Sequence, residues 1–246
     1  KKVNYINEII ITMYRMDAEQ FQKARDFFSE LPHHWRIIWN DGPRMKMIYK
    51  HLEDLGFQIG EQGKGSQSWM AFGYVFATGA SDVIALHDCD IVNYSPELLA
   101  RLVYPMVHPT HPFEFCKGYY SRLSDRMHGR VTRLFVTPLI RALEKMLGKN
   151  DFLDYLDSFR YILSGEFALS TELASQLRVP SDWGLEVGIL AEVYRNTVLH
   201  RIAQVDIAER YEHKHQEIKW DDLNTGILKM AVDIAKSIFR TLAAQG

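Results

Sequence analysis

Several features that define other classes of protein are scarce or missing in this sequence of 246 residues. It has two cysteines, Cys89 and Cys116, which lie too far apart to suggest a disulfide framework and are typical of a reducing, cytoplasmic compartment. No apolar run approaches the roughly 18 residues that a membrane span needs, and no signal peptide is visible. We therefore expect a cytoplasmic protein without a membrane partner.

An excess of charge is also missing. The 29 Lys and Arg residues nearly balance the 31 Asp and Glu residues, and the net charge of −2 leaves no basic footprint for nucleic acid. The apolar content of 47% is enough for the core of one large domain or two small ones. The sequence lacks an initiator methionine, and we interpret it as a chain that is incomplete at its start.

Strand and helix patterns alternate along the first third of the chain. Asp17 and Gln20 have the spacing of a helix capping box. This alternation predicts an α/β fold, with a mostly parallel sheet that carries helices on both faces. Strands are predicted at 6–13, 35–39, 83–86, 113–120 and 200–207, and helices at 18–31, 45–55, 66–78, 97–104, 133–147, 185–194 and 220–244.

Two carboxylates follow the apolar strand at 83–86. Ligands of open α/β sheets bind beyond the carboxyl ends of strands, which places Asp88 and Asp90 at the edge of a cleft. If the backbone is still extended there, both side chains point to one face. Their repulsion, roughly 4 kcal/mol at 4 Å and an effective dielectric constant of ~20, would be relieved by a divalent cation. Carboxylate oxygens suit Mg²⁺ or Mn²⁺.

The same D-x-D spacing has two other interpretations. It is compatible with a solvated turn at a strand end, where Asp is common. It also fits the D-x-D-x-[TV] signature of haloacid-dehalogenase-type phosphatases, through Val92. That signature normally follows the first strand of its fold, whereas two strand–helix units precede it here. The later acidic pair of those phosphatases is missing as well.

Two glycine-containing segments have the character of anion sites at helix starts. Gly63-Lys64-Gly65 offers free N–H groups and a positive charge before a helix, although it lacks the spacing of a P-loop and is also compatible with a flexible turn. Gly129-Arg130-Val131-Thr132 stands at the start of a later helix and could share an anion with its N–H groups. The alternative is an ordinary helix cap, with Thr132 as the capping hydroxyl.

Further polar residues lie at conspicuous places. Glu166 is flanked by small residues, which allow either a ligand or another part of the chain to approach closely. Glu186 lies at the start of an otherwise apolar helix. Its side chain would either interact favourably with the helix dipole or point into a cleft. His213 and His215 lie in a polar loop and are either solvated or metal ligands.

Taken in order, these segments resemble the retaining GT-A glycosyltransferases that include the glucosyl-3-phosphoglycerate, mannosyl-3-phosphoglycerate and glucosylglycerate synthases. The resemblance covers about residues 9–216. It rests on Gly63-Lys64-Gly65, Asp88-Cys89-Asp90-Ile91, Lys117-Gly118-Tyr119-Tyr120, Gly129-Arg130-Val131-Thr132, Gly165-Glu166-Phe167-Ala168, Trp183-Gly184-Leu185-Glu186-Val187-Gly188 and Ala203-Gln204-Val205-Asp206.

The resemblance implies transfer of glucose from a nucleotide-diphosphate glucose to 3-phosphoglycerate or glycerate, with Mg²⁺ or Mn²⁺. It implies that Asp90 and His213 hold the metal. The donor would be bound by Gly63, Lys64, Asp88 and Cys89, and Glu186, Glu166 and Asp88 would be catalytic. The small anionic acceptor would be bound by Gly129, Arg130, Val131, Thr132, Lys117 and His215.

The sequence also departs from the family's pattern. The usual His-x-Asn is His213-Lys214-His215 here, which puts the acceptor contact of that Asn in doubt. The family's first strand and acidic loop, which hold the nucleotide base, are not found. We expect a transferase domain at 1–218 and a helix at 219–246 that packs on it or on a partner, compatible with a homodimer. A mannosyltransferase and a non-catalytic nucleotide-sugar-binding domain remain alternatives.

Overall fold

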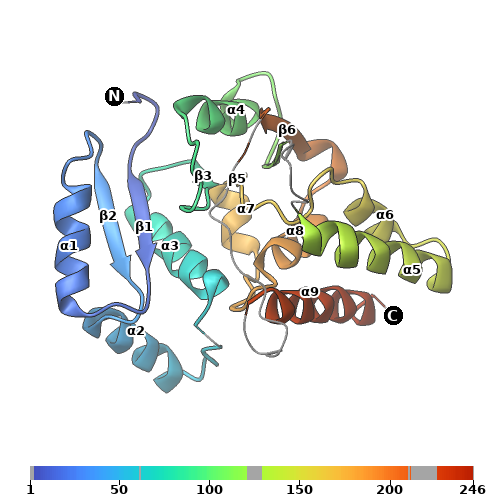
Figure 1. The fold of residues 1–246 in the computed structure, drawn as a ribbon, viewed down its shortest axis with the longest axis horizontal. Coiled ribbons are helices and arrows are strands. Elements are labelled where there is room, and N and C mark those ends of the chain that lie inside the picture. The colour runs from blue at the N-terminus through green and yellow to red at the C-terminus, as the bar shows by residue number, and fades with distance from the viewer. Residues whose placement is uncertain (1–2, 61, 121–128, 210, 212–225, 246) are drawn as a thin grey trace.

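The computed structural model describes residues 3–60, 62–120, 129–209, 211 and 226–245. It is an α/β structure with two sheets, and the helices surround them (Figure 1). The polar loop with His213 and His215 lies outside the described residues. No described helix has both the length and the apolar character needed to cross a membrane.

The first sheet is a pair of parallel strands at the start of the chain. Strand β1 (Ile9–Met13) pairs in register with β2 (Trp35–Trp39). Helix α1 (Ala18–Phe28) connects them and begins at the predicted capping box: the Gln20 amide donates to Asp17 Oδ1 at 2.8 Å, and the Asp17 amide donates to Gln20 Oε1 at 2.9 Å. Helix α2 (Pro43–Asp54) follows, with Pro43 at its first position.

The second sheet carries the centre of the molecule. Its strands are β3 (Val83–Leu86), β5 (Phe167–Ser170), β4 (Phe115–Tyr120) and β6 (Ile202–Ala208), in that spatial order. Strand β5 runs antiparallel to both β3 and β4, while β4 and β6 are parallel. Three of its four strands therefore share one direction, as predicted, and β5 is the exception that the sequence did not reveal.

Buried apolar side chains lie on both sides of this sheet. The larger cluster joins β4 and β5 to four later helices, at residues 137–147, 151–157, 185–196 and 226–243, and the smaller one lies beneath the helix at 96–107. The remaining helical elements are α3 (Lys64–Thr78), α4 (Pro96–Val107), the π-helix η1 (Thr132–Val136), α5 (Thr137–Leu147), α6 (Asp151–Asp157), α7 (Thr171–Gln176), α8 (Leu185–Asn196), the 3₁₀-helix η2 (Leu199–Arg201) and α9 (Gly226–Ala243).

Two helices differ from the prediction in a physically informative way. The helix predicted at 97–104 continues through Pro105 to Val107, since a proline near the end removes only one helical hydrogen bond. The helix expected from Arg133 begins one turn earlier and contains η1. Pi-helical turns are rare and occur often at functional sites.

Candidate active site

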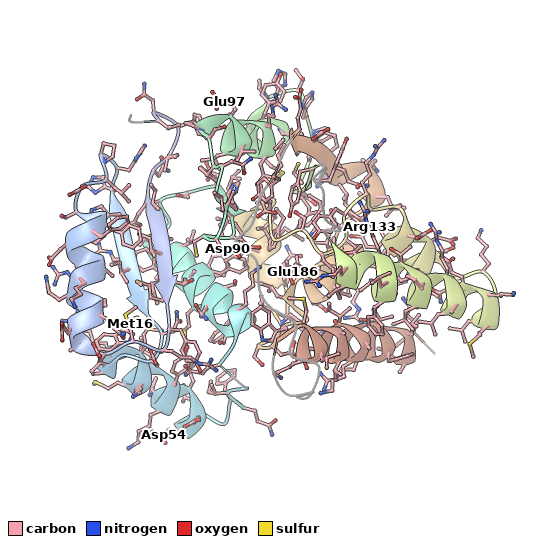
Figure 2. The ribbon with its side chains drawn as sticks, viewed as in Figure 1. Met16, Asp54, Asp90, Glu97, Arg133 and Glu186 are labelled. Carbon is pink, nitrogen blue, oxygen red and sulfur yellow. The ribbon has the colours of Figure 1, made fainter. Side chains whose placement is uncertain are left out.

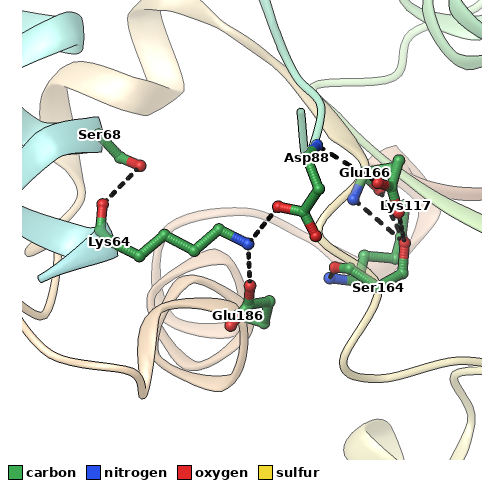
Figure 3. A network of polar contacts seen from close by, with 7 residues as sticks. All are labelled: Lys64, Ser68, Asp88, Lys117, Ser164, Glu166 and Glu186. Atoms are coloured by element: carbon green, nitrogen blue, oxygen red, sulfur yellow. Dashed lines mark hydrogen bonds and ion pairs between the residues drawn. The ribbon is translucent and has the colours of Figure 1, made fainter. Parts of the chain in front are cut away.

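A lysine and two carboxylates from three distant elements meet beside the carboxyl end of β3 (Figure 3). Lys64 is the first residue of α3, Asp88 lies two residues beyond β3, and Glu186 is in the first turn of α8. Lys64 Nζ donates to Asp88 Oδ1 at 2.6 Å and to Glu186 Oε1 at 2.7 Å. The structure thus brings together three residues that the sequence analysis assigned to the donor and to catalysis.

The two carboxylates decide the charge of Lys64. Burial by itself lowers the pKa of the ammonium group, but the attraction of Glu186 and Asp88 outweighs it, and the pKa of Lys64 is raised above its ordinary value. Lys64 is therefore a permanent cation at neutral pH. Its two carboxylate partners fix the position of the ammonium group, so the positive charge is already in place when an anion arrives.

Gly165 explains how Asp88 is held. A Cβ atom at this glycine would lie only 2.6 Å from Asp88 Cγ and would overlap the carboxylate. The small residue next to Glu166 thus admits the side chain of Asp88. The sequence left open whether the small residues around Glu166 admit a ligand or another part of the chain. The structure shows that they admit another part of the chain, the side chain of Asp88.

Glu166 lies behind Asp88 and is completely buried. Its Oε1 accepts a long hydrogen bond of 3.4 Å from the Asp88 amide, and its Oε2 accepts from the Ser164 hydroxyl at 3.0 Å. Tyr211 stacks on Tyr120 with ring centroids 3.8 Å apart, and burial together with the nearby Glu166 carboxylate raises the pKa of the Tyr211 phenol. Glu166 is thus positioned by a complete set of neighbours.

Lys117 is the second lysine of the site. It extends from β4, is 1% exposed, and donates from Nζ to the Ser164 carbonyl at 2.6 Å. Burial lowers the pKa of Lys117 to about 8, although Glu186, Glu166 and Asp88 attract its charged form. In contrast to Lys64, it has no carboxylate hydrogen-bond partner among the described residues.

The start of α3 is held by the segment that precedes α8. A Cβ atom at Gly63 would lie 2.8 Å from the Ser181 carbonyl oxygen, and one at Gly65 would lie 2.7 Å from the Pro180 carbonyl carbon. The Ser66 amide donates to the Ser181 carbonyl at 3.3 Å. The glycines on either side of Lys64 therefore serve close backbone packing, which fixes Lys64 beside Glu186.

The predicted metal ligands are only partly within the described structure. The strand ends at Leu86, and Cys89 and Asp90 form a turn, so the extended backbone assumed for Asp88 and Asp90 is not present. Figure 2 places Asp90 and Glu186 toward the middle of the molecule. Cys89 is an exposed free thiol. The described ranges contain no group of three His, Cys, Asp or Glu side chains arranged for a metal, and His213 lies outside them.

The predicted acceptor segment forms the beginning of the η1–α5 helix. Gly129 has a φ of +66°, a left-handed conformation that favours glycine. Its backbone carbonyl oxygen accepts a hydrogen bond from the Arg133 amide at 3.0 Å. Arg130 is exposed and Val131 is half-buried. Thr132 is buried, and its hydroxyl has no hydrogen-bond partner among the described residues, so the interpretation of Thr132 as a helix cap is wrong.

Comparison with known proteins places this geometry in context. No protein-family model matches the chain. The chain is 51% identical, over all 246 residues, to the glucosyl-3-phosphoglycerate synthase of Persephonella marina, and 42% identical over 242 residues to that of Methanococcoides burtonii. The chain is thus similar to two glucosyl-3-phosphoglycerate synthases. It spans 61% and 59% of the lengths of these two synthases.

Solved structures of such a synthase share the fold. The crystal structure of glucosyl-3-phosphoglycerate synthase from Mycobacterium tuberculosis, in complex with Mn²⁺, UDP-glucose and phosphoglyceric acid, matches 96% of this chain and 79% of its own. The TM-score is 0.63 at 21% identity. A further complex of the same synthase, with glycerol 3-phosphate, matches with a TM-score of 0.62. The predicted GT-A fold is thereby confirmed.

Sequence reasoning missed three parts of the Glu166 environment. Ser164 donates to the Glu166 carboxylate, Tyr211 lies near it, and Gly165 admits Asp88. The only signal for Gly165 was the row of small residues around Glu166. Tyr211 gave no signal, since its role depends on a contact across 45 positions of the chain.

Proposed function

We propose that the protein is a retaining glycosyltransferase that moves glucose from a nucleotide-diphosphate glucose to 3-phosphoglycerate or glycerate. The observation that carries this proposal is the 51% identity with a glucosyl-3-phosphoglycerate synthase along the entire chain. The meeting of Lys64, Asp88 and Glu186 at the carboxyl end of β3 supports it, because sugar-nucleotide donors need a fixed cation and sugar-binding carboxylates in one place.

The charge of the site is suited to a divalent cation. Two lysines, Lys64 and Lys117, interact with three carboxylates, those of Asp88, Glu166 and Glu186, which leaves negative charge in excess. Asp90 adds a further carboxylate on the adjacent turn. Hard oxygen donors of this kind suit Mg²⁺ or Mn²⁺.

Asp90, with help from Asp88 and from His213, would hold the metal. When bound, this ion would neutralise the charge that develops on the departing nucleotide diphosphate. The chain's own cation acts at the same point: Lys64 offers its ammonium group to the diphosphate, and Gly63 and Cys89 flank the donor. Because Lys64 is already oriented by two carboxylates, it needs little reorganisation when the donor arrives.

The carboxylates behind Lys64 would bind the sugar. Glu186 reaches the cluster from α8 and is our candidate for the group on the reacting face, where its negative charge would stabilise an oxocarbenium-like transition state. Glu166, held by Ser164, would accept hydrogen bonds from sugar hydroxyls, and Asp88 would contact the donor's ribose or sugar. We assign no general base.

The acceptor would bind at the start of η1. Arg130 is exposed and Thr132 has an unpartnered hydroxyl within the described structure, so both can donate to a carboxylate or phosphate. Gly129 and Val131 shape the backbone there. We infer that Lys117 and His215 contribute to the acceptor's anionic groups.

Replacement of Asp90 by alanine tests the assignment of the metal. We expect Asp90→Ala to lower the metal-dependent release of nucleotide diphosphate by at least about 10³-fold, because the variant loses a ligand of the charge-neutralising ion. Coupled detection of the released nucleotide, with titration of Mn²⁺, measures this loss. Full activity in the variant would remove Asp90 from the site. Binding of UDP-glucose without turnover by the unmodified chain would favour the non-catalytic alternative.

Replacement of Arg130 by alanine tests the acceptor side. We expect Arg130→Ala to raise the KM for 3-phosphoglycerate by about 10–100-fold, because a charge-assisted hydrogen bond is lost, with little change in the donor KM. The exposed Arg133→Ala, one turn further along, serves as a control for the change in charge. A larger effect on the donor KM would assign Arg130 to the donor instead.

Three further assignments complete the proposal. We infer a cytoplasmic location, which accords with two free cysteines in the described structure. We infer that residues 1–218 form the transferase domain and that the helix at 219–246 packs on it. Contacts of α9 with α8 and η1, and the burial of Ile234 and Ile238, support this packing. Analytical ultracentrifugation would test the homodimer.

A further inference from the structure

A second concave region lies between α8 and α9, apart from the Lys64 cluster. It is a groove of about 650 Å³, a volume typical of small-molecule sites. One wall is the segment from Arg178 to Asp182, and the other walls are the flanks of α8 and α9 that face each other. None of its charged side chains takes part in the Lys64 cluster.

The groove is lined by an unusual number of charged side chains. Glu192, 5% exposed, forms an ion pair with Arg195 at 2.5 Å and accepts a hydrogen bond from the Arg178 amide at 3.1 Å. Asp233, 2% exposed, has two lysine partners on its own helix, at 3.2 and 3.7 Å. The buried acids are therefore already paired before any ligand binds.

Two arginines of the groove are left over. Within the part of the chain that the structure describes, the guanidinium groups of Arg178 and Arg240 have no hydrogen-bond or ion-pair partner. The three lining arginines balance the three lining acids, and two lysines behind Asp233 bring the local excess to two positive charges. The residues in this balance are Arg178, Arg195, Arg240, Asp182, Glu192, Asp233, Lys229 and Lys236.

The positive charge of the groove determines which kind of ligand can bind there. A phosphate monoester carries between one and two negative charges at neutral pH and accepts forked hydrogen bonds from guanidinium groups. The guanidinium groups of Arg178 and Arg240, which have no partner within the described structure, come from two walls of the groove and match such a group in charge and in hydrogen-bond donors. The remaining volume of the groove is enough for the body of a small metabolite.

The groove shares a wall with the candidate active site. Pro180 lines the groove and packs against Gly188 of α8, while its carbonyl group packs against Gly65 at the start of α3. Asp182 also lines the groove and accepts from the Gly184 amide at 2.8 Å, two residues before Glu186. A ligand that presses on this wall therefore acts on both segments that position the Lys64–Glu186 ion pair.

We propose that the groove between α8 and α9 is an effector site for a small phosphorylated molecule. Its occupancy stabilises the segment from Pro180 to Gly184 and, through it, the placement of Lys64. The binding part of this inference is independent of the proposed function, whereas the effect on sugar transfer rests on it.

Calorimetry with inorganic phosphate and pyrophosphate tests the site. The double variant Arg178→Gln/Arg240→Gln is expected to weaken binding at the groove at least tenfold and to leave basal sugar transfer unchanged. Lys145→Gln/Lys149→Gln, which removes two exposed positive charges on and after α5, is the matched control and should bind phosphate as the parent does. Arg130→Gln should also retain this binding, which separates the groove from an acceptor site.

Hydrogen exchange tests the connection to the active site. Saturating phosphate should slow exchange of the amides at 181–184 and 63–66 roughly tenfold in the parent chain and leave them unchanged in the arginine double variant. Equal phosphate binding by all variants would overturn the site. Loss of binding in the double variant, with no slowing at 63–66 in the parent, would overturn the coupling. Neither readout needs turnover, so an inactive chain that passes both tests would count against the proposed function alone.

Discussion

The two lysines of the candidate site show how differently one residue type behaves in two neighbouring regions. Lys64, at the start of α3, is partly exposed and forms ion pairs with Asp88 and Glu186. Lys117, within the sheet, is buried and donates to a backbone carbonyl. The pKa of Lys64 is raised and that of Lys117 is lowered to about 8. The direct hydrogen-bond partner of each lysine therefore affects its pKa more than the number of nearby carboxylates does.

This contrast separates two tasks. Lys64 remains charged throughout the physiological range and can act as a fixed cation. Lys117 is close to losing its proton, and its main contact is the Ser164 carbonyl, in the segment that positions Glu166. We therefore expect changes at Lys64 to affect chemistry first, and changes at Lys117 to affect the stability of the fold first.

Within the comparison of the two lysines, the largest effect is expected from removing the cation of Lys64. Lys64→Met leaves Asp88 and Glu186 facing each other without a partner, and we expect kcat/KM to fall by about 10²–10³-fold. The free energy of unfolding should decrease by about 2–3 kcal/mol, because two partly buried carboxylates lose their counterion. Steady-state kinetics and urea unfolding measure the two effects. Lys64→Arg, which retains the charge, should remain within about tenfold of the parent; equal losses in both variants would contradict the electrostatic role.

A smaller effect is expected from disturbing the Asp88 end of the ion pair. Gly165→Ala inserts a Cβ atom where the Asp88 carboxylate now lies, and we expect about a tenfold loss of kcat/KM and about 1–3 kcal/mol of destabilisation. Gly73→Ala is the matched control, because a Cβ atom there has no neighbour within 4 Å and Gly73 is an exposed position within helix α3. It should be neutral or stabilising. Wild-type activity in Gly165→Ala would show that Asp88 can move without consequence.

The last effect, a pH dependence of stability that is absent at neutral pH and develops above about pH 8, sharpens the contrast from the side of Lys117. Its pKa is about 8 in the folded chain, against an ordinary value of 10.5, so the unfolded chain binds more protons between these two values. The contribution of Lys117 to the free energy of unfolding therefore rises with pH from about 8 to 10.5, by at most about 1.4 kcal/mol per pH unit. Urea unfolding at several pH values should show this slope in the parent chain and in an exposed control, Lys145→Met. The slope should disappear in Lys117→Met, and its persistence there would assign it to other groups.

Local sequence signals predicted much of the framework. Strands β2 and β3 have the predicted bounds, because each is a compact apolar run between strong turn signals. The cap at Asp17 was also predicted correctly, since both of its hydrogen bonds lie within four residues. Strand β5 was missed, since four residues next to a short helix leave no periodicity to detect, and its antiparallel direction depends on neighbours far along the chain.

The site was predicted as a set of residues rather than as an arrangement. The motifs pointed to Lys64, Asp88 and Glu186 one by one, but the ion pairs among them join positions up to 122 apart and have no local signature. The same is true of Gly63 and Gly65, for which the sequence left both an anion site and a flexible turn open, and which also allow close backbone packing. The metal assignment of Asp90 and the acceptor assignment of Arg130 stay predictions.

The separation of 122 positions between Lys64 and Glu186 has a consequence for how the chain is made. Contacts that close such long loops form late, because the loss of chain entropy precedes any gain from packing. At a synthesis rate of about 5–20 residues per second, α3 leaves the ribosome on the order of ten seconds before its partner on α8 exists. Helix α3 and strand β3 can fold early, but the centre of the molecule waits for α8. The candidate active site is thus among the last parts of the protein to be completed.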